Sequence, residues 1–202
     1  MGRISQVGKI ITSLTDVGSI LDVGCRDGVL KKHIPSDMSY FGSDLFKNGN
    51  HVNYVGDIME VSFDRKFDVV TAIDILEHLE NPSKAFDKLL EITEKYLIVS
   101  LPNCYDLKKR YSFAAHGTMG GKYHFSDKEI LDRHRWLMGL AEIEYFFEAK
   151  SKKHTLKLNI FDVKYGSSDR MKGKALIGKF FSIILSRNLS TETLIGLFEK
   201  SN

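Results

Sequence analysis

The chain of 202 residues has little cysteine and no long apolar run. Its two cysteines, Cys25 and Cys104, stand in unrelated contexts without the paired spacing of a metal site, so we expect no metal ligands and a reducing compartment. No window reaches the roughly 18 consecutive apolar residues of a membrane-spanning helix. Residues 1–4 lack the apolar core of a secretory leader, so the sequence predicts a cytoplasmic protein.

Two phosphate-binding motifs are also missing. The chain contains neither G-x-G-x-x-G nor G-x-x-x-x-G-K-S/T, which argues against a dinucleotide pyrophosphate site and against a P-loop. The hydrophobic content of 43% and the charged content of 27% are ordinary for a globular chain. At this length the sequence predicts a single compact domain over residues 1–202.

Charge is distributed unevenly along the chain. Residues 1–103 carry 11 basic and 15 acidic side chains, whereas residues 104–202 carry 18 basic and 11 acidic ones. An acidic first half suits a cationic ligand, and a basic second half suits an anionic substrate or surface. A solvated, lysine-rich face would explain the same counts.

Residues 20–28 organise the rest of the chain. An apolar run is interrupted by Asp22 and followed by Gly24 and Gly28, in the spacing Asp-x-Gly-x-x-x-Gly. A glycine turn at the carboxyl end of a strand is typical of the cofactor crevice of a doubly wound α/β sheet. Gly24 lets the backbone approach a ligand closely, and Gly28 lets the next helix pack against the strand.

Hydrophobic periodicity predicts the remaining elements. The predicted strands are residues 19–23, 39–44, 52–55, 67–73, 96–100, 156–163 and 192–199. The predicted helices are residues 4–15, 29–34, a helix that begins at Asn81-Pro82, residues 141–151 and residues 174–186.

Together with downstream residues, this stretch resembles the first motif of the class I S-adenosylmethionine-dependent methyltransferases, of the small-molecule and glycan type. The downstream residues are Asp44 after the second strand, Asp57 after the third and the run 77–79, Glu-His-Leu. Arg26 stands where the family usually has a further glycine. The resemblance implies a Rossmann-like doubly wound sheet of seven strands, mostly parallel with an antiparallel last strand.

The resemblance also implies S-adenosyl-L-methionine as the cofactor. Asp44 would accept hydrogen bonds from both ribose hydroxyls, since a carboxylate accepts two donors at once. Asp57 would contact the adenine amino group, and the backbone of Ile58 a ring nitrogen. The full set of expected cofactor residues is Asp22, Gly24, Cys25, Gly28, Asp44, Leu45, Asp57, Ile58, Ile73 and Asp74.

Two further stretches concern the methyl acceptor. The run 74–79 resembles the family's fourth motif in its small-molecule form and lacks the Asn-Pro-Pro-Tyr type sequence of enzymes that methylate bases, so a nucleic-acid partner is not expected. Residues 104–138 are rich in polar aromatic side chains and exceed an ordinary connection, so they are predicted to form a lid or substrate insertion.

Methyl transfer depends mainly on alignment. Holding donor and acceptor in line contributes roughly 7–11 kcal/mol, more than one proton-transfer residue supplies. A hydroxyl or amine acceptor still benefits from a base with a pKa near neutrality, which suits histidine. The predicted catalytic residues are His78 and His124, with His116 and His134 as further candidates, although each is also compatible with a structural role.

Several alternatives stay open at this stage. Lys122, Arg133 and Arg135 either hold an anionic substrate or are solvated, and Trp136 is more typical of a core anchor than of a stacking platform. The departure at Arg26 is compatible with a non-catalytic cofactor-binding module, and the basic second half with a protein or RNA methyltransferase. Helix 174–186 is expected to cover the sheet rather than to dock on a membrane. The oligomeric state is not indicated.

Overall fold

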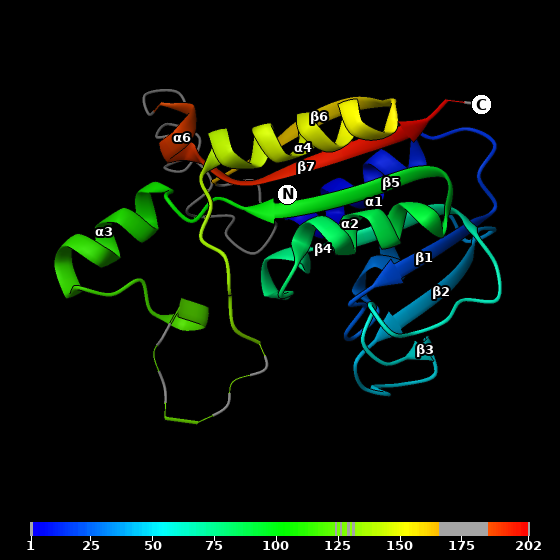
Figure 1. Cartoon of the computed structure of the whole chain (residues 1–202), viewed down its shortest axis with the longest axis horizontal. Helices are drawn as coiled ribbons and strands as arrows, with labels where there is room; N and C mark the ends of the chain where they lie inside the picture. Colours follow the sequence, from blue (N-terminus) through cyan, green and yellow to red (C-terminus); the bar gives the residue numbers. More distant parts are fainter. Residues whose placement is uncertain are drawn as a thin grey trace.

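A seven-stranded sheet forms the centre of the computed structural model, which describes residues 2–123, 125, 127–128, 130, 132–165 and 186–201 (Figure 1). The strands are β1 (Ser19–Val23), β2 (Ser39–Asp44), β3 (Val52–Val55), β4 (Phe67–Ile73), β5 (Thr93–Pro102), β6 (Leu156–Lys164) and β7 (Thr191–Lys200). Their order is β3-β2-β1-β4-β5-β7-β6. Strands β1 to β5 pair in parallel, and β7 runs antiparallel to both β5 and β6. The predicted Rossmann-like fold is confirmed.

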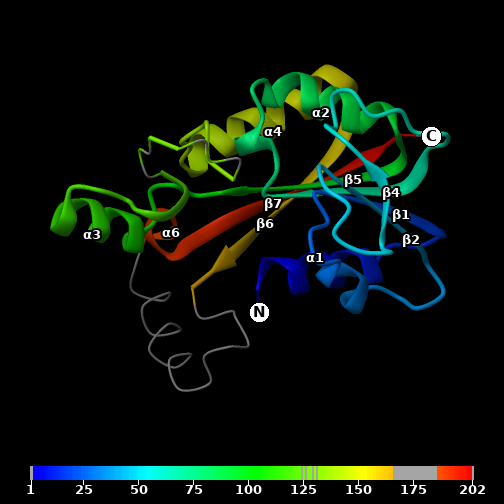
Figure 2. The ribbon, with the colours of Figure 1, turned by 90° about the horizontal axis from the view of Figure 1, so that it is seen from below.

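Helices cover both faces of the sheet (Figure 2). The described helices are α1 (Arg3–Thr12), α2 (Pro82–Glu91), α3 (Leu107–His116), α4 (Leu140–His154) and α6 (Arg187–Ser190), with 3-10 turns η1 (Val29–His33), η2 (Leu76–His78) and η3 (Gly121–Tyr123). Helices α2 and α4 pack on one face, and α1 and η1 pack on the other. The doubly wound arrangement leaves the carboxyl ends of the parallel strands open at one edge.

The apolar side chains of the central strands form one hydrophobic core on each face of the sheet. Along β4, Val70 and Ala72 face the α2 side, whereas Val69 faces the α1 side, so the strand is apolar in both directions. On α1, buried Val7 and Ile11 lie one helical turn apart and form the stripe that contacts the sheet. Both faces of the central strands are therefore covered.

Several element ends differ from the prediction. The helix predicted over residues 4–15 ends at Thr12, because the hydroxyls of Thr12 and Ser13 bind carbonyl groups of the last turns. The predicted helix 29–34 is the 3-10 turn η1, and strand 96–100 extends over Thr93–Pro102. The predicted helix 174–186 lies outside the described residues apart from its last position.

The segment 104–138 leaves the sheet after β5 and carries α3 and η3 (Figure 1). Helix α3 has no buried residue. The chain then returns to η2, where the backbone amides of Arg135 and Trp136 both point at the carbonyl of Glu77, at 2.9 and 3.3 Å. Among the described residues, no helix is long and apolar enough to cross a membrane.

A nearly buried lysine joins the two helices on the α2 face. Lys150 of α4 donates to the Asp87 carboxylate of α2 at 2.6 Å, and that carboxylate also accepts from Lys153 and His154. Burial opposes ionisation of Asp87, but these hydrogen bonds outweigh it and hold its pKa well below the usual range. The Lys150–Asp87 ion pair therefore holds α4 against α2.

Replacement of Asp87 tests this arrangement. Asp87→Asn should lower the free energy of unfolding at pH 7 by about 2–4 kcal/mol, because the Lys150 ammonium loses its counter-charge. Because the pKa of Asp87 is lower in the folded than in the unfolded protein, where it is about 3.9, the ionised carboxylate stabilises the fold above pH 4. The difference in unfolding free energy between wild type and Asp87→Asn should therefore shrink as the pH falls below 4. Urea unfolding at pH 7 and pH 3 measures both effects. Lys153→Ala, which removes an exposed partner, should cost less than about 1 kcal/mol; equal losses in the two variants would contradict this account.

Candidate active site

A cleft of about 490 Å³ opens at the carboxyl ends of β1, β2 and β4. The parallel register brings these ends together, as expected for ligand sites in open α/β sheets. Nine of the ten expected cofactor residues line the cleft: Asp22, Gly24, Cys25, Asp44, Leu45, Asp57, Ile58, Ile73 and Asp74. Their role in cofactor binding remains a prediction, but the structure gathers them around one cavity.

The turn after β1 has an unusual backbone. Gly24, Arg26 and Gly28 have φ angles of 70°, 46° and 63°, so all three lie in the left-handed region. In this conformation the amide of Arg26 donates to Asp44 Oδ2 at 2.8 Å. Gly28 does not line the cleft. It precedes η1, and a Cβ there would lie 2.8 Å from the ring of His51, so close packing requires the glycine.

Asp44 is the last residue of β2. One of its carboxylate oxygens accepts a short hydrogen bond from the turn after β1, and the other accepts only a long one. Oδ2 accepts from Arg26, whereas Oδ1 receives a long contact of 3.4 Å from the amide of Phe46. Asp57 caps its own turn by accepting from the amide of Met59 at 2.8 Å, and the amide of Gly56 donates to the carbonyl of Asp44. The carboxylates after β2 and β3 are thus held at adjacent positions on the cleft wall.

Asp22 and Cys25 lie at the floor of the cleft. Asp22 is 4% exposed and accepts from Tyr40 Oη at 2.7 Å and from Thr71 Oγ1 at 2.9 Å, and its burial raises its pKa to about 6. Cys25 packs against Gly42, where an added Cβ would lie 2.7 Å from its sulfur. Burial, followed by the charge of Asp22, raises the pKa of Cys25 to about 12, so the group is an inert thiol.

Contacts that the sequence did not reveal come from distant segments. Arg3 of α1 forms an ion pair with Asp74, which also accepts from Ser100 Oγ at 2.6 Å. The guanidinium of Arg26 binds Asp132 at 2.6 Å, and both residues line the cleft. No local pattern signals these pairs, since their partners are joined only by the fold.

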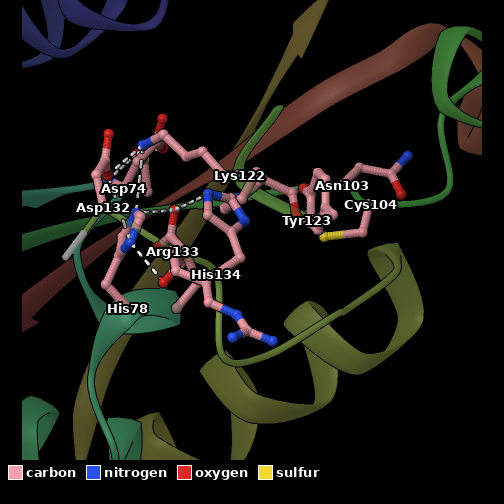
Figure 3. A network of polar contacts seen from close by, with 12 residues as sticks. Asp74, His78, Asn103, Cys104, Lys122, Tyr123, Asp132, Arg133 and His134 are labelled. Carbon is pink, nitrogen blue, oxygen red and sulfur yellow. Dashed lines mark hydrogen bonds and ion pairs between the residues drawn. The ribbon is translucent and has the colours of Figure 1, made fainter. Parts of the chain in front are cut away.

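Asp132 connects the 104–138 segment to the cleft (Figure 3). One of its oxygens pairs with Arg26 and the other with Lys122, at 2.6 and 2.8 Å. Although partial burial opposes ionisation, these two cations lower the pKa of Asp132 to about 2. Lys122 was a candidate anion holder; in the structure its charge faces an acid of its own segment.

The candidate catalytic histidines occupy different environments. His78 lines the cleft, with Nδ1 3.0 Å from the carbonyl oxygen of Arg133 and Nε2 3.4 Å from Lys122 Nζ (Figure 3). Burial, and then the charge of Lys122, lowers the pKa of His78, so its ring is neutral at pH 7. His124 lies outside the described residues. His116 is exposed at the end of α3 and is not part of the cleft.

His134 and Glu77 form a buried group behind His78. The rings of His78 and His134 meet edge to face, with centroids 4.6 Å apart. Glu77 is fully buried, and within the described part of the chain neither of its carboxylate oxygens has a hydrogen-bond partner. Burial, and then the charge of Asp74, raises the pKa of Glu77 to about 8.

The prediction of a core position for Trp136 is wrong. The side chain is 47% exposed, and its indole Nε1 donates to the carbonyl of Leu79 at 2.9 Å. The chain that returns over η2 runs outside the sheet here, and the indole satisfies its polar group through this bond to the cleft-lining Leu79.

Comparisons with known proteins bear on this site. A family model described as a methyltransferase domain matches residues 4–154. A search of curated proteins finds no match.

Among solved structures, the small RNA methyltransferase HEN1 is 18% identical with a TM-score of 0.64, and the match covers 99% of this chain and 25% of that one. The plantazolicin methyltransferase BpumL, in complex with a triazolic analogue and S-adenosylhomocysteine, is 18% identical with a TM-score of 0.61. That match covers 98% of this chain and 82% of the BpumL chain. A methyltransferase from Archaeoglobus fulgidus is 15% identical with a TM-score of 0.58, covering 98% and 92%. The chain thus spans a quarter of the HEN1 chain and most of the other two.

The buried carboxyl of Asp22 predicts a pH-dependent stability. Because its pKa is about 6 in the fold against 3.8 as an ordinary aspartate, the folded state holds the proton more tightly. The resulting stabilisation is complete below pH 4 and is lost as the pH rises through 6. Relative to Asp22→Asn, the wild type should therefore lose about 2–3 kcal/mol between pH 3 and pH 7, measured by urea unfolding. Exposed Asp27→Asn is the control, and parallel pH profiles for wild type and Asp22→Asn would contradict the assignment.

Proposed function

The chain belongs to the methyltransferase domain family and depends on S-adenosylmethionine, and from this premise we propose that it methylates a hydroxyl group of a small molecule or a glycan. The observation that carries the proposal is the cleft itself, where the turn after β1 and the acid after β2 are joined by the Arg26–Asp44 hydrogen bond. On its far side the same cleft meets a neutral histidine.

The residues present fit the cofactor. A cavity of about 490 Å³ is within the usual range for a small-molecule site. Asp44 Oδ1 has acceptor capacity for ribose hydroxyls, and Asp57 with the backbone of Ile58 lies beside it for the adenine. The left-handed turn at Gly24 would hold the amino-acid end; the side chain of Ile75 packs so closely against this turn that a Cβ at position 24 would clash with it.

When bound, S-adenosylmethionine supplies a methyl group activated by the positive sulfonium. The protein's task is then to align the acceptor, which can contribute roughly 7–11 kcal/mol without a catalytic triad. His78 lies on the acceptor side, and its hydrogen bond to the Arg133 carbonyl assigns the proton to Nδ1. The lone pair of Nε2 faces Lys122 Nζ at 3.4 Å, so it could serve the acceptor only after that ammonium moves away.

We assign residues 104–138 to the acceptor side as a substrate insertion. Asp132 ties the segment to Arg26 in the cofactor turn and to Lys122, and the segment's amides bind the carbonyl of Glu77. The exposed indole of Trp136 beside Leu79 offers a flat apolar face at the entrance, of the kind that packs on a sugar ring. His124 of this segment remains a predicted second catalytic residue.

RNA is a second candidate acceptor. It is favoured by the basic second half of the chain and by the likeness in fold to the small RNA methyltransferase HEN1. Phosphate contacts make RNA affinity fall steeply with salt. Binding of a short RNA that weakens between 50 and 200 mM salt, followed by methyl incorporation, would favour RNA over a glycan.

Asp44 provides the direct test of the cofactor site. Asp44→Asn removes one carboxylate acceptor and its charge, and should weaken S-adenosylhomocysteine binding by roughly 10–100-fold, since hydrogen bonds to charged groups contribute about 1.5–3 kcal/mol. Titration calorimetry measures the affinity, and release of S-adenosylhomocysteine in the presence of candidate acceptors measures turnover. Asp37→Asn, an exposed acid before β2, should bind like the wild type. Unchanged affinity in Asp44→Asn would refute the assignment.

A further inference from the structure

We propose that Glu77, His78 and His134 form a binding site for one divalent transition-metal ion, such as Mn²⁺ or Zn²⁺, at the acceptor end of the cleft. Each residue offers one ligand atom, and these atoms all lie within 4.8 Å of one another. Two imidazole nitrogens and one carboxylate form a donor set that divalent transition metals prefer over Mg²⁺ or Ca²⁺.

The first support is the buried carboxylate of Glu77. Its side chain has no exposed surface, and in the described ranges both oxygens lack a hydrogen-bond partner. A buried polar group without a partner is costly, and native structures rarely keep one without a reason. A bound cation would provide the missing interaction for Glu77.

The second support is the spacing of the ligand atoms. Glu77 Oε1 is 3.9 Å from His78 Nε2 and 3.8 Å from His134 Nε2, which is too long for hydrogen bonds. Ligands at about 2.0–2.2 Å from one ion lie about 3–4 Å from each other. The distances from Glu77 to both histidines therefore match those between ligands of a shared ion, and all three ligand atoms lie within 4.8 Å of one another.

The third support is the orientation of His78. Its Nδ1 faces the carbonyl of Arg133 at 3.0 Å, so the unprotonated Nε2 points to the cluster. Metal-binding histidines usually donate their other ring N–H to a carbonyl or carboxylate in this way. Tyr123 packs edge to face on His134, with ring centroids 4.9 Å apart, and limits its rotation.

Lys122 is the positive charge that now faces this cluster. Its Nζ lies 3.4 Å from His78 Nε2 and 2.8 Å from Asp132, and its side chain is 34% exposed. The long flexible stem allows the ammonium to move away while it keeps its pair with Asp132. A bound divalent ion would then take the place of the Lys122 ammonium beside Asp74 and Glu77, with two positive charges instead of one.

The site also indicates the acceptor, and this step rests on the proposed function. Three protein ligands leave coordination positions open, as in catalytic metal sites. His78 contributes to both the cluster and the cleft wall, so an open position faces the cleft. An acceptor hydroxyl bound there through its oxygen would have a lower pKa, and its O–H bond would break with loss of the proton to water. The metal site therefore favours an oxygen acceptor.

Metal titration of the full chain tests the site without any methyl transfer. After treatment with a chelator, the wild type should bind Mn²⁺ alone, and separately Zn²⁺ alone, at one ion per chain in calorimetry, with a rise in melting temperature. Glu77→Gln and His134→Gln should each weaken binding at least about tenfold. His33→Gln, at the exposed last residue of η1, should bind like the wild type.

Measuring S-adenosylhomocysteine binding by the same variants distinguishes a misfolded variant from one that has lost only its metal ligand. It also tests the metal site independently of the proposed cofactor site. Variants that bind S-adenosylhomocysteine normally but have lost Mn²⁺ support the site. Absence of stoichiometric binding by the wild type, or equal affinity in wild type, Glu77→Gln and His134→Gln, overturns it. If the wild type binds the ion but not S-adenosylhomocysteine, the metal site stands and the cofactor assignment fails.

Discussion

The carboxyl group of Asp22 joins the three strands on which the cleft is built. It is part of β1, and it accepts hydrogen bonds from Tyr40 of β2 and Thr71 of β4. Asp22 pairs in register with Gly42 of β2 and Thr71 of β4. The turns that follow these three strands therefore begin at similar positions along the strand direction. A buried acid with two satisfied oxygens penalises any slip of one strand against the next. The position of Asp44 opposite the turn after β1 depends on this register.

The two sides of the cleft are held by different means. The side proposed for the cofactor is formed by strand ends and by short turns whose backbone amides bind Asp44 and Asp57. The side proposed for the acceptor is formed by η2 and by a long segment that is attached through Asp132 and through amides on the carbonyl of Glu77. Sites on strands are more precisely placed than sites on loops. The fold therefore builds the proposed cofactor side from strand ends and the proposed acceptor side from a long connection between β5 and α4.

The strands that carry the proposed cofactor side could be predicted, because their signals are local. Strands β1 to β4 have the predicted bounds, since apolar runs end where a glycine or an acid begins. The predicted bounds of β5 were too short because Thr93, Glu94 and Lys95 are polar and extend the strand through the backbone. The contacts of Arg26 with Asp132 and of Arg3 with Asp74 join residues more than 70 positions apart, and no periodicity encodes such pairs. Arg26 itself adopts the left-handed conformation that a glycine would adopt readily, so its presence does not by itself argue for a non-catalytic module.

The acceptor side shows why the same residues can have two roles. In sequence, the run at Glu77 and His78 resembles a motif that covers the cofactor, and nothing nearby indicates His134, which follows 56 residues later. Only the return of the chain over η2 places the second imidazole beside the buried carboxylate. A shared ion would then hold η2 to the segment more strongly than the two backbone hydrogen bonds on the carbonyl of Glu77.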